Sequence, residues 1–540
     1  MLRRRVSTAI NISGFELTLA ALSPFGACPA PFFEPNPDVF NDFTGWKMTE
    51  KYRPYLHMTP DSGWMNDPNG LVFFNGHYHQ FYQYYPSDTV WGPMHWGHKI
   101  STNLIDWQEL GPALYPDESG MCFSGSAIVD WHNTSGLFET GKPGLLAFYT
   151  SFIQPKVTLA NGTEVEDPIQ QQSLAYSQDG LTWKKYADGA PIISARGNPD
   201  FRDPKVIWHE QSQAWVMVVS CGQHIEFYRS TNLLDWRLVS EFGYRHGAHS
   251  KGPWECPDLF ELPIEGLQEK RWVLVVGIGE GAHCGGAGTQ YFIGDFDGET
   301  FVNHNHPETV LWLDFGRDYY ATQSFSDIPE ADGRRIVSTW MSNHQYSLEL
   351  PTQQFRSSMA MPRELFLFDG KAGLRVGQRF VKELNQALSL DVQTPEPSDE
   401  QAISLYSQQE VMKFSADVAL QDTQTLHLNV YQDNPVYFEF VLVEQGVEVR
   451  SVRRGQFGTE RIDEHFPHDY RVTLPIDNKF QVEVLIDKGS VELLINAGQF
   501  SFTNLVYAKE TQASVALSVD SGSLALRNVQ VSSLAGEKTC

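Results

Sequence analysis

Short runs of alternating apolar and polar residues, separated by turn residues, dominate this 540-residue chain. In the stretch GLVFFNGHYHQFYQYYP, two aromatic-rich runs flank Asn75-Gly76, a dipeptide typical of a tight β-hairpin. Another form recurs, in which a strand is followed by a short Ser/Asn/Asp/Gly turn and an aromatic residue that opens a second strand. It occurs at residues 96–110, 173–186, 225–239 and, more weakly, 291–304. The pattern therefore predicts repeated β-hairpins.

These hairpins belong to larger repeated units, because another hairpin precedes each of them. A fifth unit, at residues 321–343, lacks a clear second hairpin. Repeated units of about four strands are typical of the blades of a β-propeller. A sandwich of hairpins is the alternative, but long units of two hairpins favour a propeller with five blades.

The pattern changes after residue 373. Residues 376–390 have helical spacing, and a Pro- and acid-rich segment follows. From residue 411 onward, short alternating strands return with turn signals every ten residues or so, which indicates a β-sandwich. We therefore predict an all-β protein in four parts: a leader or extension (1–51), a five-bladed catalytic propeller (52–373), a linker with a short helix (374–410) and a β-sandwich (411–540).

The first residues resemble a signal peptide, with a basic start, an apolar patch and small residues. Asn11 and Glu16 interrupt the apolar patch, so a plain extension of a cytoplasmic protein is the alternative to secretion. The sequons at Asn133 and Asn161 would permit glycosylation in a eukaryotic secretory route. Since no apolar run is long enough to cross a bilayer, we expect no membrane partner.

Charge and composition exclude several classes of partner. The formal net charge of −26 would repel nucleic acid, and no basic stripe is present. The six cysteines lack C-x-x-C spacing and the 17 histidines lack an H-E-x-x-H pattern, so we expect neither a metal nor a cofactor. The chemistry should therefore rest on the side chains themselves.

Acidic residues stand near the start of several predicted units. Asp67 in GWMNDPNG could be a structural turn residue, since Asp-Pro and Asn-Gly are turn sequences. Yet similar places in the next units carry Ser124 in CFSGS, Arg202 and Asp203 in FRDP, and Glu255 in WECPD. The first strand of each propeller blade lines the central channel, so we expect the three carboxylates to meet at one mouth of it. Turn formation does not require acids at corresponding positions of three units.

Carboxylates in an aromatic-rich setting indicate glycoside hydrolysis, which needs one ionised and one protonated carboxyl group. Turn amides around Asp67 would favour its anion and suit a nucleophile. Glu255 lies between Trp254 and Cys256-Pro257, an apolar setting that suits a general acid. The neighbouring Arg202 would keep Asp203 ionised, so Asp203 suits the binding of sugar hydroxyls.

WMNDPNG, FRDP and WECP, in this order, resemble glycoside hydrolase family 32, the invertases, inulinases and related β-fructosidases. The resemblance runs from residue 52 to about residue 531 and implies a five-bladed propeller followed by a sandwich. It implies that Asp67 is the nucleophile, Glu255 the acid/base and Asp203 a transition-state stabiliser. It also implies sugar contacts by Asn66, Gln83, Trp91, Ser124, Arg202 and Trp340. The two tryptophans could equally be core residues.

The leading hypothesis is a retaining, exo-acting β-fructofuranosidase that releases fructose from sucrose or fructans. Endo-acting inulinases often carry Glu in place of Asp67 and Val in place of Cys256, so this chain has the exo-type pattern. Three alternatives remain: a fructosyltransferase, a catalytically silent sugar-binding propeller and an inverting arabinan-type hydrolase. The motifs separate neither sucrose from inulin or levan nor one oligomeric state from another.

Overall fold

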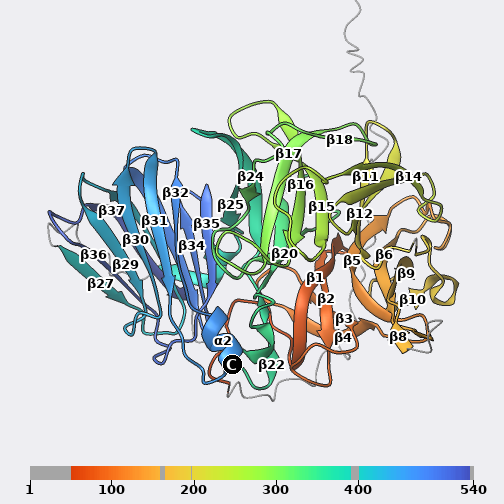
Figure 1. Ribbon diagram of the computed structural model, residues 1–540, viewed down its shortest axis with the longest axis horizontal. Coiled ribbons are helices and arrows are strands. Elements are labelled where there is room, and N and C mark those ends of the chain that lie inside the picture. Colours follow the sequence, from red (N-terminus) through yellow and green to blue (C-terminus); the bar gives the residue numbers. More distant parts are fainter. Residues whose placement is uncertain (1–49, 159–163, 196, 391–400, 536–540) are drawn as a thin grey trace, which may run out of the picture. The chain divides into compact units, whose positions relative to one another are not determined.

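The computed structural model describes residues 50–158, 164–195, 197–390 and 401–535 (Figure 1). Residues 1–49 of the predicted leader, the Asn161 sequon and residues 391–400 of the predicted linker lie outside the described residues. Regular structure is almost entirely β-strand. The exceptions are two short helices and two 3-10 turns: α1 (Leu384–Ala387), α2 (Glu460–His465), η2 (Tyr186–Gly189) and η3 (Ser347–Glu349). None of these described helices has the length and apolar character that a bilayer crossing demands.

Between residues 50 and 380, the described strands form five larger sheets, most of them simple antiparallel meanders. The first sheet has the order β22 (Phe355–Arg356), β1 (Gly63–Phe74), β2 (His77–Tyr85), β3 (His95–Ser101), β4 (Gln108–Leu114). The second has the order β5 (Met121–Asp130), β6 (Gly144–Ile153), β9 (Ile169–Ser177), β10 (Lys184–Lys185). The third sheet has the order β11 (Phe201–His209), β12 (Ala214–Cys221), β13 (Ile225–Ser230), β14 (Arg237–Phe242). The fourth has the order β15 (Trp254–Pro263), β16 (Lys270–Ile278), β17 (Gly288–Phe296), β18 (Phe301–Asn303), and β19 (Leu311–Trp312) pairs with β17. The fifth is β20 (Tyr320–Ser324), β21 (Arg335–Met341), β24 (Arg363–Gly370), β25 (Gly373–Phe380), with β23 (Ser358–Met359) on β21. A separate hairpin joins β7 (Lys156–Thr158) to β8 (Glu164–Glu166).

The first strands of these sheets close a ring. Strand β1 contacts β5, β5 contacts β11, β11 contacts β15, β15 contacts β20, and β20 returns to β1. Sheets arranged radially about a ring of inner strands form a β-propeller. The predicted all-β class and the propeller are thus confirmed. We keep the count of five blades as a prediction, because pairing also attaches the outlying β19, β22 and β23 to these sheets.

Two of the repeated turns are alike in atomic detail. In the β3–β4 turn, the Ser101 hydroxyl accepts the amide of Leu104 at 2.8 Å, and the Trp107 indole donates to the Leu104 carbonyl at 3.0 Å. In the β13–β14 turn, Ser230, Leu233 and Trp236 make the same bonds at the same distances. In these two repeats the tryptophan closes its own turn. The Trp183 indole N–H has no hydrogen-bond partner among the described residues, and the Phe301 ring has no N–H to donate, so the aromatic residue of those repeats does not act in this way.

The helix predicted over residues 376–390 is wrong for its first half. Residues up to Phe380 form β25, which pairs with β24 through a tight turn at residues 371–372, and only α1 is helical. Pairing along a complete strand outweighs local helical spacing, which is a weak preference. Strands β24 and β25 are the second hairpin that the fifth unit lacked in the sequence, so the fifth sheet extends past residue 373.

The C-terminal part is a sandwich of two six-stranded sheets over the described residues, drawn in teal to blue in Figure 1. One sheet has the order β26 (Leu388–Leu390), β37 (Leu526–Leu534), β28 (Met412–Ala419), β33 (Lys479–Asp487), β34 (Ser490–Ile495), β35 (Phe500–Leu505). The other has the order β27 (Ala402–Tyr406), β36 (Ser514–Val519), β29 (Thr425–Val430), β30 (Val436–Val443), β31 (Gly446–Arg453), β32 (His468–Leu474). Alternate residues of both sheets fill one apolar core, as the alternating sequence predicts.

Sandwich and propeller residues share continuous cores. Leu485 and Leu494 of the sandwich pack in one apolar cluster with Leu56 and Leu71 of the propeller. The backbones also meet, since a Cβ atom on Gly316 would lie 2.0 Å from the Thr503 carbonyl oxygen. Only glycine permits so close an approach.

Candidate active site

A β-bulge interrupts each of the five inner strands near the start of its pairing. In β1, Asn66 and Asp67 together stand opposite Gln83 alone, between the pairs Met65–Tyr84 and Pro68–Tyr82. The same two-against-one arrangement occurs in β5, β11, β15 and β20. A bulge bends its strand and redirects the side chains at that point. Asp67 therefore lies in a bulged strand, and the prediction that Asp-Pro and Asn-Gly mark a turn here is wrong.

The bulges align the inner strands residue by residue. The position before the bulge is held by Met65, Cys122, Arg202, Glu255 and Tyr320. The first bulged position is held by Asn66, Phe123, Asp203, Cys256 and Ala321. The second is held by Asp67, Ser124, Pro204, Pro257 and Thr322. The three acids thus occupy three successive positions of one repeated feature, and not the corresponding position that we expected.

Asp67 is partly buried and accepts two hydrogen bonds at Oδ2. The Ser124 hydroxyl donates at 2.7 Å and the Cys256 thiol at 3.4 Å, so these donors are side chains and not the turn amides that we predicted. Burial is the largest influence on the pKa of Asp67 and raises it, and the nearby Glu255 raises it further. Ser124, His344 and Asn66 oppose this rise.

Asp203 is buried, with a backbone φ of +64° at its bulge. Its amide donates to the Thr150 hydroxyl at 3.0 Å, and its Oδ2 accepts the Cys256 amide at 2.8 Å. Burial first, and then the charge of Glu255, raise the pKa of Asp203 to about 7. Arg202 lowers this pKa without cancelling the rise, so the prediction that Arg202 simply keeps Asp203 ionised is wrong.

Glu255 lies where two donors from neighbouring sheets reach it. The Tyr320 hydroxyl donates to Oε2 at 2.5 Å, and Arg202 Nη1 lies 3.5 Å from Oε1. Arg202 also pairs with Asp200. The side chain of Glu255 is 23% exposed, which leaves one side of the carboxyl group open to a ligand.

Cys256 connects the acids, although we expected only a small buried residue. Its amide bonds to Asp203, its thiol bonds to Asp67, and it directly follows Glu255. A φ of +49° turns the backbone so that both bonds form at once. Burial and the neighbouring carboxylates raise the pKa of this thiol well above 9.0, so it stays protonated and donates.

The predicted sugar-binding residues differ in their surroundings. Asn66 accepts a hydrogen bond from the Trp64 indole N–H at 2.7 Å. Gln83 is buried and donates to the Cys122 carbonyl at 2.9 Å, so it links strands β2 and β5 in the wall of the site. Trp91 is 47% exposed, and its ring lies 6.1 Å from that of Phe123 next to Ser124, as expected at a rim.

Trp340 is fully buried beside two residues that the sequence reasoning missed. Its ring centroid lies 6.4 Å from that of Tyr320 and 5.2 Å from that of the exposed His344. Its indole N–H has no hydrogen-bond partner among the described residues. Aligning the fifth unit at its bulge would have found Tyr320, which stands where Glu255 stands in the fourth. No local sequence signal marks His344.

Known proteins resemble the chain over most of its length. The model for the glycosyl hydrolases family 32 N-terminal domain matches residues 57–376, and the model for the family 32 C-terminal domain matches residues 381–533. A levanase of Bacillus subtilis strain 168 is 40% identical over 504 residues, which are 89% of this chain and 70% of the levanase. An extracellular exo-inulinase of Aspergillus awamori is 35% identical over 486 residues, which are 85% of this chain and 90% of that protein.

Solved structures agree with these matches. The Aspergillus awamori exo-inulinase structure superposes with a TM-score of 0.80 at 31% identity and covers 91% of this chain and 100% of that one. A Schwanniomyces occidentalis fructofuranosidase complexed with fructose gives a TM-score of 0.77 at 29% identity, with 90% and 99% covered. The chain is a glycoside hydrolase that consists of a β-propeller and a β-sandwich, and it belongs to glycosyl hydrolase family 32.

Proposed function

We propose that this enzyme is a retaining, exo-acting β-fructofuranosidase that removes terminal fructosyl groups from fructans and sucrose. The relatives are named levanase, exo-inulinase and fructofuranosidase. The observation that carries the proposal is the meeting of three carboxyl groups around Cys256, which bonds to Asp67 and Asp203 and adjoins Glu255. Hydrolysis by retention requires such a nucleophile and acid side by side.

In the first step, an Asp67 oxygen attacks the anomeric carbon of the fructosyl group while Glu255 gives its proton to the departing glycosidic oxygen. The bond between that carbon and oxygen breaks, and a covalent fructosyl ester of Asp67 forms. The Ser124 and Cys256 donors hold the Asp67 carboxylate in one orientation. The hydroxyl of Tyr320 and the guanidinium of Arg202 hold Glu255 in the same way.

In the second step, Glu255 takes a proton from water, whose oxygen attacks the anomeric carbon and displaces Asp67. Two inversions give net retention of configuration. Asp203, with its pKa near 7, would present hydrogen-bonding oxygens to sugar hydroxyls throughout both steps. Asn66, Trp91 and Arg202 would complete the fructosyl pocket, with the buried Gln83 and Trp340 supporting its wall.

Product analysis tests the proposal. Purified enzyme is supplied with sucrose, inulin and levan, and proton NMR follows the first-formed anomer. We expect monomeric fructose as the first product, with the β configuration retained. The carboxyl groups of Asp67 and Glu255 should lie about 5–5.5 Å apart in a ligand-bound crystal structure, as retention requires.

Other outcomes would identify the alternatives. Inverted product would refute retention, and short fructan fragments would refute exo action. Oligosaccharides formed at high sucrose would identify a fructosyltransferase, and no product from any substrate would leave a sugar-binding propeller. Because a relative is named extracellular, we also propose secretion, which N-terminal sequencing of protein from culture medium checks.

A further inference from the structure

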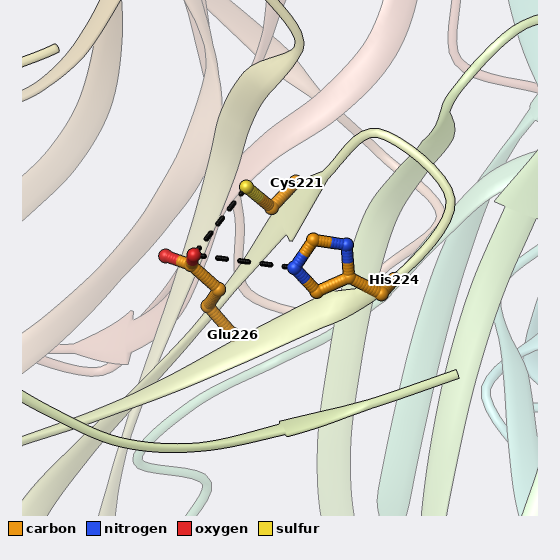
Figure 2. A group of neighbouring side chains, drawn as sticks. All are labelled: Cys221, His224 and Glu226. Carbon is orange, nitrogen blue, oxygen red and sulfur yellow. Dashed lines mark hydrogen bonds and ion pairs between the residues drawn. The ribbon is translucent and has the colours of Figure 1, made fainter. Parts of the chain in front are cut away.

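We propose that Cys221, His224 and Glu226 form a binding site for a transition-metal ion, with Zn²⁺ as the best fit. The three residues surround the turn between β12 and β13, and their side chains converge on one point (Figure 2). All three are buried. Thiolate, imidazole and carboxylate are the usual protein ligands of Zn²⁺.

The separations fit a tetrahedral ion. Cys221 Sγ lies 3.5 Å from Glu226 Oε1, and His224 Nε2 lies 3.9 Å from the same oxygen. One ligand atom of each residue lies within 4.8 Å of the other two. Usual zinc–ligand bond lengths at tetrahedral angles would place sulfur about 3.5 Å from oxygen and nitrogen about 3.3 Å from oxygen. A small movement of the His224 ring therefore completes the geometry.

Each candidate ligand is also held by an outer partner, as ligands in metal sites generally are. Asn198 Nδ2 donates to Cys221 Sγ at 3.0 Å. The Tyr228 hydroxyl bonds to Glu226 Oε2, which leaves Oε1 turned towards the other two ligands. The Tyr244 ring stacks on His224 with centroids 4.2 Å apart, and its hydroxyl lies 3.2 Å from His224 Nε2, so this hydroxyl must move aside when Nε2 binds the ion. Tyr244 is itself 60% exposed, so it is the layer between the site and solvent.

Binding of a metal ion to these residues exchanges a proton for the ion. The Cys221 thiol donates to Glu226 in the structure, so on binding it must lose its proton to solvent as the sulfur–metal bond forms. Three protein ligands leave one tetrahedral position for water.

The site lies against the wall of the active site. The carbonyl of Gly222, inside the turn, accepts the amide of Trp254 at 2.7 Å, and Trp254 precedes Glu255. An ion bound by this turn would therefore brace the strand that carries Glu255. We expect a gain in thermal stability and little change in kcat, because within the described residues no candidate ligand is bonded to any of the three acids.

Metal titration of the full chain tests the inference. Chelator-treated protein is titrated with Zn²⁺ by calorimetry in buffers of different ionisation enthalpy, and bound metal is measured after desalting. We expect one ion per chain, release of about one proton and a raised Tm. Co²⁺ should give a thiolate-to-cobalt charge-transfer band.

Two variants and a matched control make the result specific. Cys221→Ser should abolish the cobalt band and weaken zinc binding at least about tenfold, and His224→Gln should weaken it similarly. Cys284→Ser, which changes a buried thiol bonded to the Gly316 carbonyl, should bind like the unaltered enzyme. Absence of stoichiometric binding by the unaltered chain, or unchanged binding by both folded ligand variants, would overturn the inference.

Discussion

Two groups of buried carboxylates in this molecule behave in opposite ways. In the channel, Arg202 lies 3.5 Å from Glu255 and also acts on Asp203, yet the pKa of Asp203 rises to about 7. Where propeller and sandwich meet, Arg363 and His57 flank Glu492, and the pKa of Glu492 falls to about 2. Burial acts on both groups, so the opposite pKa shifts arise from the number of cations beside the carboxylates. In the channel, the carboxyl groups repel one another, which suits chemistry. In the contact region, cations neutralise the carboxylates, which stabilises the fold.

The contact region is a connected network of charges. His57 Nδ1 lies 2.8 Å from Asp487 Oδ2, and His57 Nε2 lies 2.6 Å from Glu492 Oε1. Arg363 reaches both Glu492 and Asp314, the latter at 3.1 Å. His57 and Arg363 of the propeller part thus pair with acids of the sandwich, while Asp314, which Arg363 also reaches, belongs to the propeller part.

The largest expected effect is on turnover. Replacing Asp67 or Glu255 by Ala should lower kcat by several orders of magnitude, because each removes a covalent or acid step worth about 10²–10⁴ or more. Steady-state kinetics on sucrose and inulin measure this, with circular dichroism to verify folding. Glu109→Gln, which alters an acid that accepts a hydrogen bond from Tyr82 away from the three acids, should keep near-normal kcat. Normal kcat in either folded Ala variant would refute the assigned roles.

The next effect is on the contact region. Glu492→Gln should lower the free energy of unfolding by about 3–5 kcal/mol, because it takes from each of two buried cations, His57 and Arg363, one of its two carboxylate partners. Urea unfolding measures this. Glu261→Gln breaks a solvent-exposed pair with Lys270 and should change stability by less than about 1 kcal/mol. Equal effects of the two substitutions would show that the buried network does not hold the parts together.

Neutralising a carboxyl group in the channel should instead raise the free energy of unfolding. Asp203 has a raised pKa in the fold, so its ionisation destabilises the native state as pH rises from about 4 towards 7. Asp203→Asn should therefore raise the free energy of unfolding by about 2–4 kcal/mol at pH 8 while lowering activity. At pH 3.5, where Asp203 is protonated in both states, the gain should vanish. A loss of stability at pH 8 would contradict our account of this carboxyl group.

The smallest effect is a pH dependence of the contact region. The pKa of His57 is raised to about 9, so its stabilisation is complete below pH 6.5 and is lost as pH rises through 9. We expect unfolding free energy to fall by about 3 kcal/mol or less over that range, and His57→Gln should flatten this slope. His304→Gln, at a surface pair with Asp295, should leave the slope unchanged. If unfolding free energy fell with pH equally steeply in His57→Gln, groups other than His57 would be responsible for the loss of stability.

The sequence predicts the parts of this structure that depend on local pattern. Hairpins, repeated turns and the acidic motifs depend on neighbouring residues, so the propeller, the sandwich and Asp67, Asp203 and Glu255 as candidates could be proposed from it. The pairing of β25 and the burial of Asp203 depend on segments far away in the chain. Arg363 and Glu492 also pair only after folding, so their roles had no local signal.

The repeated bulge has a consequence for redesign. Because every inner strand breaks register at the same place, a side chain at a given bulge position in one strand has a counterpart of like geometry in the next. Ala321 and Thr322, the bulge residues of β20, carry no acid. Both are buried, so a new carboxyl group at either place would need a hydrogen-bond donor from a neighbouring strand, as Asp203 has in the Cys256 amide. Acids stand at bulge positions in two of the five inner strands, at Asp67 and Asp203, and the same backbone geometry recurs in the other three.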